Sequence, residues 1–207
     1  SVAQFVFSLL LELCHRVGRH SDVVRAGGWT RHPDWSFAMP PQIELAGKTM
    51  GIVGYGRIGR QTAHIAEAFG MRILSYDVDH GNLENLLRES DVVSLHVPLF
   101  PGTRELINAR TLALMKRSAY LINTSRGPLI NEKDLADALT AGCIAGAGLD
   151  VLSVEPPPAD HPLLQVPNCI VTGHMAWSTI EARSRLIHAV IENVGAFAAG
   201  APKNVVT

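Results

Sequence analysis

A glycine-rich turn between an apolar strand and a helical segment restricts the fold of this chain more than any other feature. Residues 49–53 form an apolar run of strand length, the sequence Gly-Tyr-Gly-Arg-Ile-Gly occupies residues 54–59, and apolar side chains recur at helical spacing over residues 61–69. The first glycine of such a motif permits a tight turn, the second lets a pyrophosphate approach the backbone, and the third lets helix and strand pack closely. The pattern predicts a dinucleotide-binding unit; the alternative is a glycine turn that serves packing only.

An acidic residue indicates which dinucleotide the unit favours. Asp77 ends a second apolar run, residues 72–76, and lies about 20 residues beyond the turn, the spacing of this motif. A carboxylate at this position accepts hydrogen bonds from the ribose hydroxyls, and its charge repels a 2′-phosphate. Residues 78–80 contain no Arg or Lys. The sequence therefore predicts NAD(H) as the cofactor, with NADP disfavoured.

Strand and helix patterns alternate from this turn onward. The expected strands are 49–54, 72–76, 91–95, 119–123, 144–149 and 169–172, and the expected helices are 58–69, 82–89, 108–115, 131–141 and 178–199. Several strand runs are almost continuously apolar, which is typical of strands covered on both faces. This alternation predicts an α/β fold with a doubly wound, mostly parallel sheet of Rossmann type.

A helix and an arm are expected before the sheet. Apolar residues recur at steps of three and four over residues 2–26 and predict one helix, while residues 29–48 contain two tryptophans and three prolines and predict an extended arm. The apolar face of the helix is wider than a solvated helix needs. We expect residues 1–28 and the arm to dimerise, residues 1–200 to form an NAD-binding domain, and residues 201–207 to begin a C-terminal return segment.

Composition argues against several other classes of protein. The chain has 207 residues with 18 basic and 19 acidic side chains and no basic run, which argues against binding to nucleic acid or an anionic membrane surface. Its three cysteines are scattered, so we expect no metal site and no disulfide framework, and we expect a reducing cytoplasm. The most apolar stretch, residues 2–14, is too short to span a bilayer.

Polar side chains follow four of the predicted strands. His96 comes after the third strand, Arg126 after the fourth, Asp150 after the fifth and His174 after the sixth, and Glu155 lies in the loop beyond Asp150. In an open α/β sheet, ligands bind beyond the carboxyl ends of the strands. An arginine, two acids and a histidine are therefore expected on the edge that also carries the glycine turn.

Four segments resemble the D-isomer-specific 2-hydroxyacid dehydrogenases in order and spacing: residues 51–59, 121–130, 147–156 and 172–174. The resemblance extends over essentially the whole chain and is greatest to members that interconvert hydroxypyruvate and D-glycerate. It implies an NAD-dependent homodimeric oxidoreductase that interconverts a small 2-oxo acid and a D-2-hydroxy acid by hydride transfer. Gly173 departs from the pattern, because a proline commonly precedes the histidine. The first lobe of the family, which closes over the substrate, is not in this sequence.

The resemblance also implies roles for single residues. Arg126 grips the substrate carboxylate and polarises the 2-oxo group, His174 protonates the ketone oxygen as hydride arrives, and Glu155 holds the other imidazole nitrogen. Asp150 is implied to bind the nicotinamide carboxamide, and Thr103 to lie near the phosphates. The residues implied to contact NAD are Gly54, Tyr55, Gly56, Arg57, Ile58, Gly59, Asp77, His96, Val97, Pro98, Thr103, Thr124, Ser125, Arg126, Asp150 and His174.

Each of these roles has a structural alternative. Arg126 would instead pair with Glu132, Glu155 would be a loop carboxylate without a catalytic role, and His96 would only shape the adenine pocket. The remaining histidines are interpreted as structural: His15, His20, His32, His64, His80, His161 and His188. For the chain as a whole, the alternatives are a formate dehydrogenase, an NAD-sensing co-repressor that dimerises and recruits partners, and an inactive cofactor-domain fragment. A formate dehydrogenase usually has glutamine at the position of Glu155.

Overall fold

The computed structural model describes residues 1–77 and 80–206. Two of the positions that follow Asp77, residues 78 and 79, lie outside the described residues, as does the last residue of the predicted segment 201–207. Among the described residues, no helix is both long enough and apolar enough to cross a membrane.

The centre of the fold is a six-stranded sheet in which every pairing between neighbouring strands is parallel. The strands, in the order in which they lie side by side, are β2 (Arg72–Tyr76), β1 (Thr49–Val53), β3 (Val92–Leu95), β4 (Tyr120–Asn123), β5 (Gly146–Leu149) and β6 (Cys169–Val171). The chain runs outward from β1 to β2 and then returns to place β3 on the other side of β1. The loops leaving β1 and β3 therefore diverge, which opens a crevice at their carboxyl ends. The predicted doubly wound α/β fold is confirmed.

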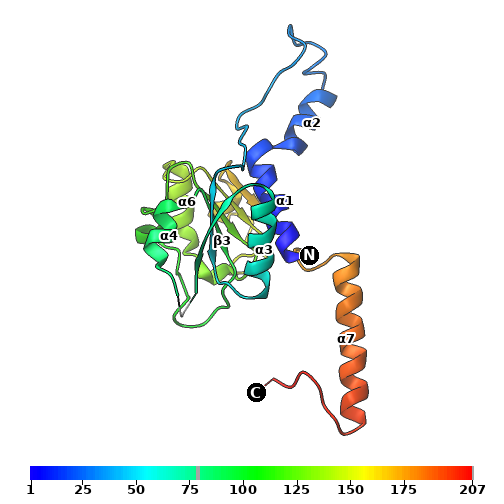
Figure 1. Ribbon diagram of the computed structural model, residues 1–207. Helices are drawn as coiled ribbons and strands as arrows, with labels where there is room; N and C mark the ends of the chain where they lie inside the picture. Colours follow the sequence, from blue (N-terminus) through cyan, green and yellow to red (C-terminus); the bar gives the residue numbers. More distant parts are fainter. Residues whose placement is uncertain (78–79, 207) are drawn as a thin grey trace.

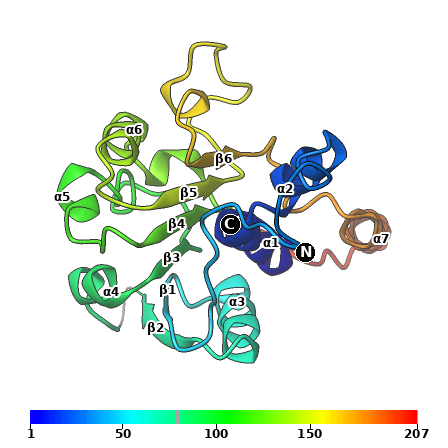
Figure 2. The ribbon, with the colours of Figure 1, turned by 90° about the horizontal axis from the view of Figure 1, so that it is seen from above.

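Helices cover both faces of this sheet (Figure 2). One face is covered by α1 (Val2–His15) and α3 (Arg57–Ala68), and the other by α4 (Leu83–Glu89), α5 (Ala109–Leu112) and α6 (Glu132–Thr140). Each face has its own hydrophobic cluster, and all side chains of the four-residue strands β3 and β4 are buried. This two-sided burial explains the nearly continuous apolar runs. Two short 3-10 turns, η1 (Gly127–Leu129) and η2 (Pro162–Leu164), have no counterpart in the predicted elements.

The N-terminal segment forms two helices where the periodicity predicts one. Arg16 lies between α1 and α2 (Val17–Arg25) with a left-handed φ of 49°, and its N–H bonds to the carbonyl oxygen of Glu12 and closes α1. The two helices therefore point in different directions (Figure 1). α1 buries most of its apolar side chains in the core of this chain, whereas α2 has no buried residue. The breadth of the α1 face is thus largely explained by packing within the domain.

The last helix, α7 (Ile180–Ala198), does not cover the sheet. None of its residues is buried, and it extends away from the body of the domain (Figure 1). The predicted helix over 178–199 is therefore confirmed, but it contributes nothing to the core. Several of its apolar side chains are more than half exposed.

Candidate active site

The glycine turn has the geometry that its motif requires. Gly54 has a φ of +96°, and a Cβ atom there would lie 2.7 Å from the carbonyl carbon of His96. A Cβ atom on Gly59 would lie 2.0 Å from the carbonyl oxygen of Gly54. In contrast, a Cβ atom on Gly56, the N-cap of α3, would meet nothing within 4 Å, and no side chain caps this helix among the described residues. The start of α3 is therefore open, with backbone N–H groups available to an anion.

Asp77 lies beside this turn, as its spacing in the sequence predicts. Its Oδ2 atom accepts a hydrogen bond of 2.8 Å from the backbone N–H of Tyr55. The carboxylate at the end of β2 is thereby fixed against the turn that follows β1. The ring of Tyr55 contacts His80 edge to face, with 6.4 Å between the ring centroids.

A cavity of about 480 Å³ opens beyond the carboxyl ends of the strands. It is lined by Val2, Ile58, His96, Val97, Pro98, Leu99, Thr124, Ser125, Arg126, Asp150, His174, Ala176 and Trp177. Sequence reasoning identifies all of these except Val2, Leu99, Ala176 and Trp177. Trp177 follows His174 by three residues, which is the one sequence signal that would have found it. Val2 reaches the cavity from the start of α1, a position that no motif marks.

Eight predicted residues lie outside the lining of this cavity. Six of them belong to the glycine turn, the start of α3 and the end of β2: Gly54, Tyr55, Gly56, Arg57, Gly59 and Asp77. The other two are Thr103 and Glu155. Thr103 is buried, and its Oγ1 donates to the carbonyl oxygen of Pro98 (2.7 Å) and accepts the N–H of Phe100 (3.0 Å). Its hydroxyl group therefore holds the loop after β3 together. Glu155 lies on the other side of His174, where both residues border a second cavity of about 340 Å³.

Two polar atoms near the main cavity are buried and have no hydrogen-bond partner among the described residues: His96 Nδ1 and Thr124 Oγ1. The other ring nitrogen of His96 lies 2.9 Å from Ser94 Oγ. Burial lowers the pKa of His96 to about 4, so the ring is neutral at pH 7. Leaving buried polar atoms unpaired costs free energy. Both atoms are therefore suited to hydrogen bonds with a bound ligand.

Hydrogen bonds fix the turn that carries Arg126. Asn123 Oδ1 accepts the N–H of Ser125 (3.0 Å), Asn123 Nδ2 donates to the carbonyl oxygen of Arg126 (2.8 Å), and Ser125 Oγ donates to Leu95 at the end of β3 (2.7 Å). The Arg126 side chain itself is exposed. The alternative partner for Arg126, Glu132, instead accepts the N–H of Ser153 and contacts His161.

His174 and Glu155 form a close pair, with 2.7 Å between Nδ1 and Oε2. Their side chains are 40% and 38% exposed, so the pair is accessible from solvent. Burial by itself raises the pKa of Glu155, but the hydrogen bonds from His174 and from the N–H of Leu152, with the charges of His174 and Arg126, lower it below its ordinary value. Glu155 is therefore ionised at neutral pH. With Nδ1 engaged, Nε2 is the ring nitrogen left for a ligand.

Asp150 anchors the turn that carries His174. Its Oδ1 accepts hydrogen bonds from Thr172 Oγ1 (2.6 Å) and from the N–H of Met175 (2.9 Å), and its Oδ2 accepts the N–H of Ala176 (2.8 Å). Asp150 is fully buried. These bonds join positions more than twenty residues apart, and nothing in the sequence indicates them.

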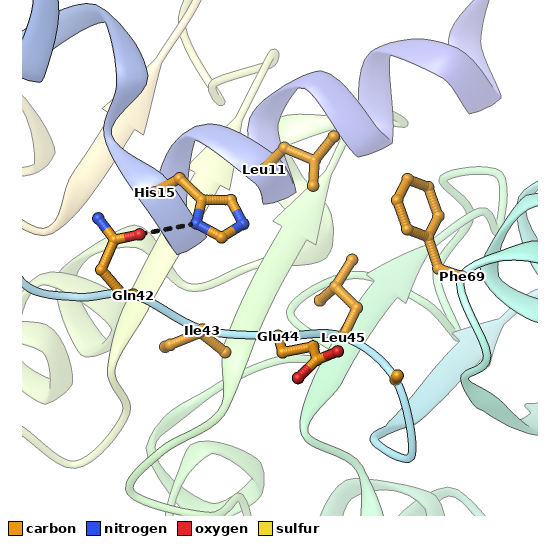
Figure 3. A pocket seen from close by; sticks show the side chains of 8 residues that line it. Leu11, His15, Gln42, Ile43, Glu44, Leu45 and Phe69 are labelled. Carbon is orange, nitrogen blue, oxygen red and sulfur yellow. Dashed lines mark hydrogen bonds between the residues drawn. The ribbon is translucent and has the colours of Figure 1, made fainter.

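A further cavity of about 410 Å³ lies at the opposite edge of the sheet (Figure 3). It is bounded by α1, by the segment 42–46 that enters β1, and by Phe69 at the end of α3. His15 Nδ1 and Gln42 Oε1 are joined by a hydrogen bond of 3.2 Å, drawn as a dashed line in Figure 3. This cavity is mostly apolar and lies at the amino end of β1, away from the acid and histidine pair. The candidate active site is therefore the cavity at the carboxyl edge.

Comparisons with known proteins identify the family of this chain. The NAD binding domain of the D-isomer specific 2-hydroxyacid dehydrogenases matches residues 7–176. The whole chain aligns at 49% identity with a hydroxypyruvate reductase of Blautia hydrogenotrophica and at 43% with a glycerate dehydrogenase of Methylorubrum extorquens, and it covers 67% and 68% of those proteins. A solved D-lactate dehydrogenase from Aquifex aeolicus, complexed with NAD and lactic acid, aligns with a TM-score of 0.83 and 33% identity over 96% of this chain and 66% of its own. The chain spans about two thirds of the length of these relatives, and it belongs to the D-isomer specific 2-hydroxyacid dehydrogenase family.

Proposed function

We propose that the full-length protein is an NAD-dependent oxidoreductase that interconverts a 2-oxo acid and a D-2-hydroxy acid, with hydroxypyruvate and D-glycerate as the substrate pair. The observation that carries the proposal is the 2.7 Å contact between His174 Nδ1 and Glu155 Oε2 beside the cavity. A histidine oriented by a carboxylate is suited to general acid–base catalysis. Relatives at 49% and 43% identity are named hydroxypyruvate reductase and glycerate dehydrogenase, which supports this choice of substrate.

NAD(H) is the cofactor of the matched family, and the residues of this chain fit it. The open N-terminus of α3 at Gly56 would receive the pyrophosphate, and Asp77 would accept hydrogen bonds from the ribose hydroxyls. The unpaired atoms His96 Nδ1 and Thr124 Oγ1 would bond to polar groups of the cofactor. When bound, the reduced nicotinamide supplies the hydride.

The side chains beside the main cavity would each have a separate role in the reaction. His174 would deliver a proton from Nε2 to the substrate oxygen in reduction and remove it in oxidation. Glu155 orients the ring and, because it is ionised, stabilises the positive charge on the ring when His174 is protonated. Arg126 would hold the substrate carboxylate through its planar set of donors. Asp150 holds the His174 turn and would also face the nicotinamide carboxamide.

Turnover by the full-length protein tests this proposal. With NADH, hydroxypyruvate should be reduced faster than pyruvate or glyoxylate, and formate with NAD should give no reaction. Because a relative named glyoxylate reductase, from Korarchaeum cryptofilum, shares 44% identity, glyoxylate is the most informative competing substrate. Binding of NADH without turnover of any of the three 2-oxo acids would instead support the NAD-sensing co-repressor.

A homodimer is the proposed assembly. α2 and the arm after it expose Val17, Trp29 and Trp35 by 64%, 51% and 88%, and such an apolar surface is typical of a protein–protein contact. A hydrogen bond within the arm holds its two tryptophans together: Trp29 Nε1 donates to the carbonyl oxygen of Trp35 (3.0 Å). Sedimentation at micromolar concentration should show a dimer, and Trp35→Ala should weaken it. A wild-type monomer under these conditions would refute the assembly.

We also propose a reducing cytoplasm as the compartment. The three cysteines of the described chain, Cys14, Cys143 and Cys169, are free. Burial raises the pKa of Cys14 to about 11, although Lys48 opposes this, and burial raises the pKa of Cys169 to about 12. These two thiols are therefore protonated and unreactive at neutral pH.

A further inference from the structure

The loop that presents Glu155 has little hydrophobic packing of its own. Val151 and Leu152 are buried at its start and His161 at its end, whereas residues 153–160 are exposed or half-buried. Glu155 nevertheless meets His174 at 2.7 Å. Because proton transfer depends on a well-defined geometry, contacts other than core burial must hold this loop in place.

Glu132, the first residue of α6, closes the loop at both ends. Its Oε1 accepts the backbone N–H of Ser153 at 2.6 Å, and its Oε2 lies 3.2 Å from His161 Nε2. The Glu132 and His161 side chains are only 17% and 9% exposed, so the bond between them is largely shielded from water, and this shielding strengthens it. One carboxylate on a helix thus connects the point where the loop leaves the body of the domain to the point where it returns.

The tautomer of His161 fits this arrangement. Its Nδ1 accepts the backbone N–H of Leu163 at 3.3 Å, which leaves the proton on Nε2 for donation to Glu132. Leu163, in η2, is fully buried in the same hydrophobic cluster as the inner face of α6. The two residues that hold the loop are therefore both anchored to the core, Glu132 through α6 and His161 through η2.

We propose that Glu132, with His161, is a positioning residue for the acid–base pair: it braces segment 153–161 and thereby sets Glu155 against His174. Neither Glu132 nor His161 lines the main cavity, so their effect on the reaction passes through Glu155. This inference rests on the proposed function, in which His174 transfers the proton and Glu155 orients its ring.

Variants of the full-length protein test the inference. Glu132→Ala should lower kcat for hydroxypyruvate by about 10- to 100-fold, the range expected when a catalytic group is slightly misplaced, and leave the KM for NADH unchanged. Glu132→Gln should lower kcat less, because it keeps an acceptor for Ser153 but turns an NH2 group toward His161. Asp134→Ala is the matched control, since Asp134 also lies in the first turn of α6 and accepts a backbone N–H, that of Ala109 at 2.8 Å, without touching the loop. Its kcat should equal that of the wild type.

A double-mutant cycle with Glu155→Gln separates positioning from a general structural role. If Glu132 acts through Glu155, Glu132→Ala should cost much less in the Glu155→Gln background than alone. Equal losses in both backgrounds, or an unchanged kcat in Glu132→Ala, would overturn the inference. If Glu155→Gln alone leaves kcat unchanged, the proposed function fails and the inference with it. Circular dichroism and NADH binding verify folding, and should Glu132→Ala not fold, Glu132→Gln is carried through the same cycle.

Discussion

Asp150 holds His174 in a left-handed backbone conformation. The N–H of His174 donates to the carbonyl oxygen of Asp150 at 2.8 Å, and His174 has a φ of 53°. The Asp150 carboxylate binds the residues on both sides of His174, and Trp177 Nε1 donates to the His174 carbonyl oxygen at 2.9 Å. A non-glycine residue in this region is strained and persists only when its surroundings enforce it. The position of the proposed acid–base group therefore depends on a buried carboxylate.

Replacing Asp150 should loosen this turn. Asp150→Asn exchanges one acceptor oxygen for an NH2 group, which faces a backbone or hydroxyl donor whichever way the amide is turned. We expect the free energy of unfolding to fall by about 1–3 kcal/mol, and kcat to fall because His174 is displaced. Urea unfolding measures the first effect and steady-state kinetics the second. Asp137→Asn is the control, because Asp137 is exposed and pairs only at the surface with Lys133; a similar loss there would contradict this explanation.

The glycines of the turn provide a matched pair of variants. Gly59→Ala would place a methyl group 2.0 Å from the carbonyl oxygen of Gly54, and overpacking of this kind costs about 1–3 kcal/mol of stability or more. Gly56→Ala meets no atom within 4 Å and has a φ of −73°, so it should cost much less stability than Gly59→Ala, only the small loss of an alanine in place of a glycine N-cap. Its methyl group should, however, weaken NADH binding, because it stands where the pyrophosphate approaches. Thermal unfolding and NADH titration separate the two effects; a Gly59→Ala protein as stable as the wild type would show that helix and strand are not in close contact there.

The preference for NADH over NADPH should depend on the charge of Asp77. Asp77→Asn keeps one oxygen acceptor, which can still accept the N–H of Tyr55, and removes the charge that repels a 2′-phosphate. We expect the ratio of the NADPH dissociation constant to the NADH dissociation constant to fall by about tenfold, which corresponds to roughly 1.4 kcal/mol. Titration of both cofactors measures it. An unchanged ratio would mean that another group sets the preference.

The pair formed by Glu155 and His174 also contributes to the pH dependence of stability. The pKa of Glu155 is lowered in the folded state, so its contribution is present above its unfolded-state pKa and is lost as pH falls through the folded-state pKa. The wild type should therefore be slightly more stable than Glu155→Gln at neutral pH. The difference should begin to fall near the ordinary pKa of a glutamate, about 4.3, and vanish only below the lowered folded-state pKa. The effect is small and sensitive to salt, because the carboxylate is more than a third exposed. Tm measured against pH tests it; a difference that grows toward acid would have the wrong sign.

Local patterns predict most of the fold and much of the candidate site. The glycine turn, the alternation of strands and helices, and the rule that ligands bind beyond strand ends predict that Asp77, Arg126 and His174 lie on one edge of the sheet. The strand pairings then confirm the predicted sheet. These features were accessible because each depends on residues close together in the sequence.

Other features depend on contacts between distant segments. The break at Arg16 has no signature, because a left-handed arginine cannot be recognised from residue type. The bonds from Asp150 to the His174 turn join residues more than twenty positions apart, as do those from Glu132 to Ser153 and His161. His161 is therefore interpreted from sequence as an ordinary structural histidine. Only the folded chain shows that His161 contacts Glu132 at the end of the loop that carries Glu155.

The central claim is that His174 transfers the proton while the glycine turn and Asp77 bind the cofactor. The most direct test is His174→Ala in the full-length protein, with kcat measured in both directions and the NADH dissociation constant measured on the same preparation. We predict that kcat falls by about 10²–10⁴-fold while NADH affinity stays close to that of the wild type. Wild-type turnover in this variant, or a loss confined to NADH binding, would contradict the assignment of His174 as the acid–base group.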